Sequence, residues 1–254
     1  ALQDAGRFPS ATYQQAVLGL SALWAEPLEN SPYFRARDLG EAVRSAVLYW
    51  CEIQNSDGSF NEYYENDRSF CPTAFTTFSV ASAFDTCREV FSEAESVEVM
   101  SSLSRSAAWL ATQSNPSVMN QMIVSMLSLR LVSELTGNED LYASFAKRRE
   151  DVLSAQTEEG WFPEYDGADV GYSFMALDLF ATYLLRWQDP EIVTAGERLI
   201  IFLTSFLHPD GTAGGHYGSR CTQHVFPFGV EYFAKNGSSE ARQIRQWLRH
   251  NLSR

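Results

Sequence analysis

The chain has 254 residues, of which 45% are hydrophobic and 20% are charged, so it is long enough for a sizeable core and too apolar for a disordered polyelectrolyte. Its formal charge of −13 argues against nonspecific binding to nucleic acid or to an anionic membrane surface. No apolar run approaches the ~20 residues that a membrane-spanning helix needs, so we expect no nucleic-acid partner and no membrane span.

Stretches with helical character follow one another along the chain and alternate between two kinds. The first kind is apolar on most faces, which predicts burial on two sides. It occupies residues 12–24, 72–86, 118–135, 170–186 and 221–235. The second kind carries charges on one face and occupies residues 37–54, 93–113, 139–156, 190–207 and 238–252. No stretch alternates convincingly with period two, so we expect little β-structure.

Glycine-containing turns recur at a fixed interval between these helices. Gly160 and Gly211 are 51 residues apart, and Gly58 and Gly160 are 102 apart, which is twice that interval. The missing copy falls at 109–117, where Asn and Pro stand in place of Gly. The repeat predicts an all-α fold, an α/α toroid of about five helical hairpins (ten helices in an inner and an outer ring), as a single domain over residues 1–254.

Two of these turns share a short motif, Q-x-x-x-G-x-F, at Gln54–Phe60 and Gln156–Phe162. The motif resembles the Q-x-x-x-G-x-W repeat of terpenoid cyclases. The size of the repeat and the pairing of inner with outer helices also resemble the α/α toroids of polysaccharide lyases and unsaturated-uronide hydrolases. The resemblance implies the fold more strongly than an activity, because toroids host unrelated chemistries. The D-x-D-D acid of class II terpenoid cyclases is absent from the sequence.

Polar and aromatic side chains crowd the turns, and a toroid would bring them to one mouth. Aromatic rings stack on sugar faces and charged groups bind hydroxyls, so these side chains indicate sugar binding. The proposed substrate-binding residues are Glu62, Tyr63, Tyr64, Arg68, Asn120, Tyr165, Asp169, Tyr172, Arg220 and His224. Two of them also have a structural interpretation, Asp169 as a helix N-cap and His224 as a hydrogen-bonded helix residue four positions after Arg220.

Proton-transfer groups are concentrated in the turns at Gly160 and Gly211, which are the second and third glycine turns after the first at Gly58. The proposed catalytic residues are Glu164, Asp166, His216 and Tyr217. Crowded carboxylates raise one another's pKa, and the ordinary pKa of His lies close to neutral pH. Both properties suit general acid–base catalysis.

The resemblance and these residues together suggest a carbohydrate-active enzyme that acts on an acidic, uronate-containing glycan by β-elimination. In this hypothesis Tyr217 or His216 removes the proton next to the uronate carboxylate. Arg220 and Asn120 stabilise the resulting charge, and Tyr217 or His224 protonates the leaving oxygen. Three alternatives stay open: a glycoside hydrolase with paired carboxylates, a terpenoid cyclase or prenyltransferase-like protein with an apolar cavity, and a non-catalytic glycan-binding module.

The four cysteines form no C-x-x-C pair, so neither a zinc site nor a redox motif is indicated. We expect no metal and no cofactor, a small-molecule or oligosaccharide substrate, and a cytoplasmic location. The oligomeric state is not indicated. The first residue is Ala1 rather than Met, which suggests a removed leader or a shortened chain.

Overall fold

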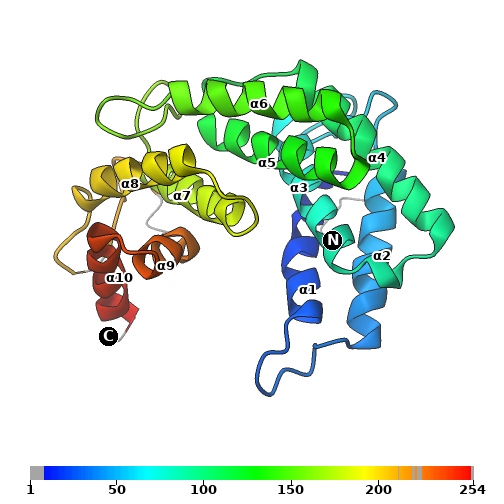
Figure 1. Ribbon diagram of the computed structural model, residues 1–254, viewed down its shortest axis with the longest axis horizontal. Coiled ribbons are helices and arrows are strands. Elements are labelled where there is room, and N and C mark those ends of the chain that lie inside the picture. The colour runs from blue at the N-terminus through cyan, green and yellow to red at the C-terminus, as the bar shows by residue number, and fades with distance from the viewer. Residues whose placement is uncertain (1–8, 211, 219–220, 222–224, 253–254) are drawn as a thin grey trace. The chain divides into compact units, whose positions relative to one another are not determined.

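The computed structural model describes residues 9–210, 212–218, 221 and 225–252. In this part of the chain the regular elements are helices, and the extended pairing consists of isolated bridges. Figure 1 shows the helices following one another as hairpins. The predicted all-α class is therefore confirmed.

The helices of the first half of the chain are η1 (Ala11–Gln15), α1 (Ala16–Ala25), α2 (Arg37–Glu52), α3 (Phe70–Thr86), η2 (Arg88–Val90) and α4 (Glu93–Thr112). Those of the second half are α5 (Met119–Thr136), α6 (Glu139–Ser154), α7 (Val170–Leu184), α8 (Pro190–Thr204), α9 (Pro227–Lys235) and α10 (Ser239–Leu252).

The chain divides into two compact units. The first comprises Ala1–Ser114 and Val124–Lys147, and the second comprises Asn115–Ile123 and Arg148–Arg254. In the first unit the apolar helices α1 and α3 pack together, as do the amphipathic helices α2 and α4 (Figure 1). In the second unit α7 packs on α9 and α8 packs on α10. Each unit thus has the inner-to-inner and outer-to-outer packing of a helical-hairpin repeat, and the single-domain organisation stays a prediction.

The apolar helices α3 and α7 are buried as predicted, whereas α1 and α9 keep large apolar side chains exposed. On α3 and α7 the side chains of Phe84, Phe174 and Phe180 are almost fully buried. On α1, by contrast, Leu18 and Leu23 remain 38% and 37% exposed. The prediction of burial on two sides is therefore wrong for α1 and α9.

Helix α9 is shorter than predicted, because it begins at Pro227 instead of near 221. Proline disfavours helical backbone in the preceding residue, and Phe226 is indeed extended, with φ −77° and ψ 114°. Proline is well suited to the first helical position, where a backbone N–H would have no partner inside the helix. A helix boundary at the proline was therefore readable from the sequence.

A carboxylate on α7 anchors the start of α9. The Gly229 N–H donates to Asp178 Oδ1 at 2.6 Å, and burial raises the pKa of Asp178 to about 6. A Cβ at position 229 would lie 2.6 Å from the carbonyl carbon of Leu177, so glycine allows the two helices to approach closely. This contact holds the helix that follows the third turn.

The four cysteines are free thiols. Cys51 and Cys87 are buried, and burial raises the pKa of each to about 11. Cys221 is exposed. Cys51 and Cys87 are thus small residues of the hydrophobic core.

Candidate functional site

The glutamine of the repeated motif is a structural link in the first unit. Gln54 Nε2 donates to the carbonyl oxygen of Ser102 at 2.9 Å and to Ser106 Oγ at 2.7 Å, both on α4. Gly58 has φ +94°, and a Cβ there would lie 2.4 Å from the carbonyl oxygen of Arg105. The turn is thus fastened to the following amphipathic helix, and glycine is required at its closest approach.

The second unit repeats this link with the same two residue types. Gln156 Nε2 donates to the carbonyl oxygens of Gly160 and Ala195 at 2.9 and 2.8 Å. Gly160 has φ +98°, and a Cβ there would lie 2.4 Å from the carbonyl oxygen of Arg198. Arg198 Nη1 also donates to Gln156 Oε1 at 3.2 Å. The motif therefore holds the turns in place, which accounts for its recurrence without any catalytic role.

The first turn, which contains Gly58, carries two exposed tyrosines. Tyr63 and Tyr64 are 67% and 68% exposed, and their ring centroids lie 6.2 Å apart. The Asp67 carboxylate accepts hydrogen bonds from the backbone N–H of Glu62 and of Tyr63, which fixes the turn. Arg68 pairs with Asp57, with 3.5 Å between Nε and Oδ2, and not with its neighbour Asp67 among the ion pairs of the described residues.

Glu62 points back into the same turn. Its Oε2 accepts a hydrogen bond from Ser69 Oγ at 2.7 Å, next to the start of α3. Glu62 is half-buried, whereas the neighbouring tyrosines are exposed. The proposed binding residues Glu62, Tyr63, Tyr64 and Arg68 are therefore close in sequence and in space within the first unit, and their role in binding stays a prediction.

The second turn buries a carboxyl group against the head of α5. Glu164 is 5% exposed, and its Oε1 accepts from the backbone N–H of Asn120 at 2.7 Å. Asn120 Nδ2 donates to both carboxyl oxygens, at 2.9 and 2.8 Å. Burial, with a smaller contribution from the charge of Asp169, raises the pKa of Glu164 to about 7, and the hydrogen bonds from Asn120 oppose this shift.

The remaining residues of the second turn have different surroundings. Asp169 accepts from the backbone N–H of Tyr172 at 2.8 Å and caps α7, so its interpretation as an N-cap is confirmed. The rings of Tyr165 and Tyr172 lie 6.3 Å apart, and Tyr165 is 57% exposed. Asp166 is exposed in a left-handed backbone conformation with φ +69°. Glu164 is thus the carboxyl group in this turn whose pKa suits proton transfer near neutral pH.

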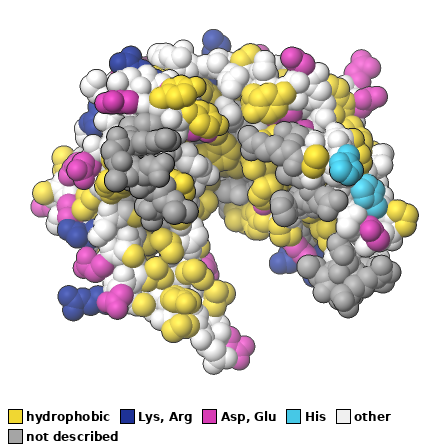
Figure 2. All heavy atoms as spheres, turned by 180° about the vertical axis from the view of Figure 1, so that it is seen from behind, with side chains coloured by type: hydrophobic (Ala, Val, Ile, Leu, Met, Phe, Trp, Pro, Cys, Tyr) yellow, Lys and Arg dark blue, Asp and Glu magenta, His cyan; other side chains and the backbone are white. Residues whose placement is uncertain are grey.

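The third turn places Tyr217 against a histidine that sequence reasoning missed. Tyr217 Oη lies 2.9 Å from His208 Nε2 and accepts from the Gly214 N–H at 3.1 Å. His216 is exposed, and its Nδ1 lies 3.9 Å from Cys221 Sγ. Figure 2 shows histidine side chains at the surface of the molecule. Arg220 and His224 lie outside the described residues.

His208 was recognisable from the sequence only through its turn. It opens the segment His208-Pro-Asp-Gly-Thr212, in which Asp-Gly is a strong turn signal. A turn of this length brings its first and last residues together, and His208 Nδ1 does lie 2.8 Å from Thr212 Oγ1.

In the second unit two of the predicted residues contact each other, and a third contacts a residue that was not predicted. Asn120 contacts Glu164, and Tyr217 contacts His208. That the turns at Gly58, Gly160 and Gly211 meet at one end of the toroid stays a prediction. The catalytic and binding roles of their residues stay predictions as well.

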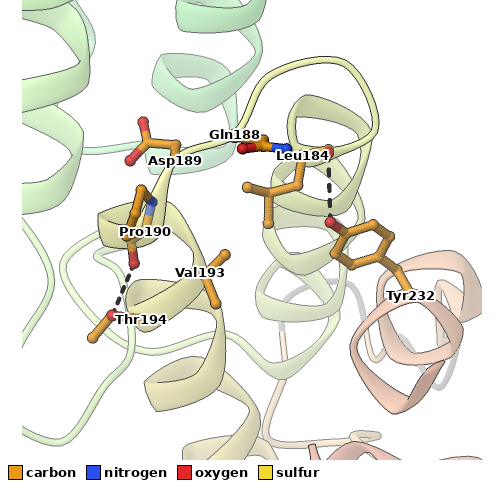
Figure 3. Close-up of a pocket in the computed structure, with 7 residues that line it drawn as sticks. All are labelled: Leu184, Gln188, Asp189, Pro190, Val193, Thr194 and Tyr232. Carbon is orange, nitrogen blue, oxygen red and sulfur yellow. Dashed lines mark hydrogen bonds between the residues drawn. The ribbon is translucent and has the colours of Figure 1, made fainter. Parts of the chain in front are cut away.

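A cavity of about 440 Å³ in the second unit contains none of the proposed residues (Figure 3). It is lined by Leu184, Gln188, Asp189, Pro190, Val193, Thr194 and Tyr232. The Asp189 carboxylate accepts two hydrogen bonds from Arg149, at 2.5 and 2.6 Å, and the Thr194 hydroxyl donates to the carbonyl oxygen of Pro190 at 2.9 Å. Most polar groups of the lining are thus engaged within the protein.

The helical-hairpin repeat and its glutamine–glycine links give the architecture of an α/α toroid. Residues 36–230, more than half of the chain, match the family described as the ulvan lyase N-terminal domain. The chain belongs to the ulvan lyase N-terminal domain family. No curated protein matches the sequence.

A solved structure with a similar fold is a GH127 β-L-arabinofuranosidase from Geobacillus stearothermophilus T6. The two chains are 13% identical, the TM-score is 0.58, and the match covers 98% of this chain and 47% of the arabinofuranosidase. This chain thus spans about half the length of that enzyme. The likeness confirms the α/α toroid fold.

Two searches within the described part of the chain found no candidates. None of its helices combines the length and the apolar character that crossing a membrane requires. None of its clusters brings together three or more His, Cys, Asp or Glu side chains in a way that suits a metal ion.

Proposed function

We propose that this chain is the helical domain of a polysaccharide lyase that cleaves an acidic, uronate-containing glycan by β-elimination. The observation that carries the proposal is the contact of Tyr217 with His208 on a turn of an ulvan-lyase-family domain. A tyrosine bonded to an imidazole can pass its proton to a neighbouring group and accept another. The family description makes ulvan the first polysaccharide to test.

The proposed reaction transfers one proton and breaks one carbon–oxygen bond. Tyr217, as a tyrosinate, removes the proton from the carbon next to the uronate carboxylate. The electron pair forms a carbon–carbon double bond, and the glycosidic oxygen at the next carbon leaves. Tyr217 then returns its proton to the leaving oxygen. His216 and His224 are the other residues proposed for these steps.

Glu164 is proposed to contact the uronate carboxylate. With a pKa of about 7 it is partly protonated near neutral pH, so it can donate a hydrogen bond to that carboxylate. Asn120 holds both oxygens of Glu164, which makes Asn120 a positioning residue in this proposal. Arg220 is proposed to neutralise the developing charge.

Two pairs of tyrosines, all exposed except the half-buried Tyr172, are proposed to stack on sugar rings. Tyr165 lies beside Tyr172 in the second unit, and Tyr63 lies beside Tyr64 in the first. Paired rings on rigidly held turns offer flat apolar faces, which pyranose rings cover well. Asp166 and Asp169 lie between Tyr165 and Tyr172 in the sequence.

A hydrolase is the second candidate, and it rests on Glu164. A buried carboxyl group with a pKa of about 7 is typical of the general acid of a glycosidase. The test is incubation with ulvan and other uronate polymers while ultraviolet absorbance and new reducing ends are followed together. Parallel increases support the lyase, whereas reducing ends without absorbance contradict it and favour the hydrolase. A chain that binds these polymers without cleaving them is a glycan-binding module.

The terpenoid cyclase alternative gains no support from the repeated motif. The Q-x-x-x-G motif links a turn to an amphipathic helix in both units. A motif with that structural role carries no information on the substrate.

A further inference from the structure

The hairpin that opens the third turn holds two side chains face to face. The His208 N–H donates to the carbonyl oxygen of Thr212 at 2.8 Å, and Leu207 and Ala213 form an isolated antiparallel bridge. This backbone pairing brings the Thr212 hydroxyl within 2.8 Å of His208 Nδ1. The backbone pairing therefore places the two side chains opposite each other.

Asp210 determines which way the Thr212 hydroxyl points. Its Oδ1 lies 3.0 Å from the Thr212 N–H and 2.8 Å from Thr212 Oγ1. Hydrogen bonds from the Thr212 backbone and side chain lower the pKa of Asp210, so the carboxylate is ionised and can only accept. The single hydroxyl proton of Thr212 is thus donated to Asp210.

The direction of the Thr212 hydrogen bond determines which nitrogen of the His208 ring carries a hydrogen. Because the Thr212 hydroxyl proton is donated to Asp210, Thr212 Oγ1 can only accept a hydrogen bond from His208 Nδ1. His208 Nδ1 must therefore carry a hydrogen. In a neutral ring His208 Nε2 is left as an acceptor, and it lies 2.9 Å from Tyr217 Oη. The competing acceptor of the tyrosine proton, the carbonyl oxygen of Phe206, is more distant at 3.4 Å.

We infer that Asp210 and Thr212 are positioning residues that hold His208 in its Nδ1–H tautomer and thereby direct the Tyr217 proton onto His208 Nε2. The catalytic part of this inference rests on the proposed lyase function. Transfer of that proton gives an imidazolium and a tyrosinate, and the Gly214 N–H, 3.1 Å from the phenolic oxygen, stabilises the tyrosinate. The proton returns from His208 to Tyr217 after each turnover.

The test is the ¹⁵N NMR spectrum of the imidazole nitrogens at mildly alkaline pH. The chain has four histidines, so the His208 signals are assigned by their loss in the His208→Gln variant. We expect the wild type to show Nδ1 protonated and Nε2 unprotonated. Thr212→Val removes the hydroxyl and should return His208 to the Nε2–H tautomer that free imidazole prefers, and Asp210→Asn should do so in part. Thr212→Ser keeps the hydroxyl and should keep the wild-type tautomer.

A purely structural role for Thr212 would not move the tautomer of a folded variant. The inference is therefore overturned if wild-type His208 is the Nε2–H tautomer, or if Thr212→Val leaves the spectrum unchanged. On a cleaved uronate polymer, Thr212→Val should lower kcat at least tenfold with little change in KM, and Thr212→Ser should be close to wild type. Wild-type protein with the Nδ1–H tautomer but no lyase activity would contradict the proposed function and still support the hydrogen-bond network.

Discussion

Glu164 shows how one residue acquires an unusual pKa. Two effects oppose each other: burial favours the neutral carboxyl group, and the donors of Asn120 favour the ion. Burial dominates, so the pKa rises to about 7. The sequence alone suggested crowding by other carboxylates as the cause, and the larger cause is burial against the head of α5.

The stability of the protein should therefore depend on Glu164 between about pH 4.5 and pH 7. Because the folded-state pKa is raised, the folded state binds more protons in this range, and stability falls as the pH rises. The full contribution is roughly 3 kcal/mol, present below pH 4.5 and lost above pH 7. Urea unfolding at several pH values should show this slope in the wild type and a shallower one in Glu164→Gln, which keeps the contribution of Asp178 with its raised pKa of about 6.

The exposed carboxylate Glu158 provides the matched control for this experiment. Glu158→Gln should keep the wild-type slope. A slope in Glu164→Gln that equals that of the wild type would contradict the assignment of the raised pKa to Glu164.

Tyr217 is the residue on which the proposed chemistry depends. Tyr217→Phe removes the hydroxyl and keeps the ring, so the fold should be retained while proton transfer is lost. We expect the rate of β-elimination to fall by roughly 10²- to 10⁴-fold. The measurement is the initial rate of double-bond formation, with circular dichroism to check folding. A variant with more than a tenth of the wild-type rate would remove Tyr217 from the mechanism.

At the scale of elements, the hairpins were largely readable from the sequence because helical periodicity is a local signal. The prediction of helix bounds and burial failed where the tertiary structure overrides the local sequence pattern. Pro227 delays the start of α9, and α1 is apolar although Leu18 and Leu23 stay exposed. The contact of Asn120 with Glu164 joins residues 44 positions apart, and no local pattern predicts it.

The glutamine–glycine turn should be intolerant of a side chain at its glycine. Gly160→Ala places a Cβ 2.4 Å from the carbonyl oxygen of Arg198 and strains a backbone with φ +98°. We expect a loss of roughly 2–4 kcal/mol in the free energy of unfolding. Gly167→Ala is the control in the same turn, since a Cβ there meets nothing within 4 Å. Equal stability of the two variants would refute the close approach.

At the scale of the whole molecule, the two units share one kind of turn but differ in the side chains around it. Both hold a turn through a glutamine and a glycine, and both have a pair of tyrosines nearby, with Tyr63 and Tyr64 in the first turn and Tyr165 next to Tyr172 of α7 in the second unit. The sequence predicted this plan because the interval of 51 residues is visible without structure. Side-chain partners such as His208 and Tyr217 depend on the folded turn and were beyond that reasoning.

The central claim is that this domain supports cleavage of a uronate polymer by elimination. The most direct measurement is the mass of the fragments released from ulvan or another uronate polymer. Elimination adds no water, so each new non-reducing end should carry a double bond and be lighter by one water than the hydrolytic fragment. Fragments with the full hydrolytic mass would contradict the account.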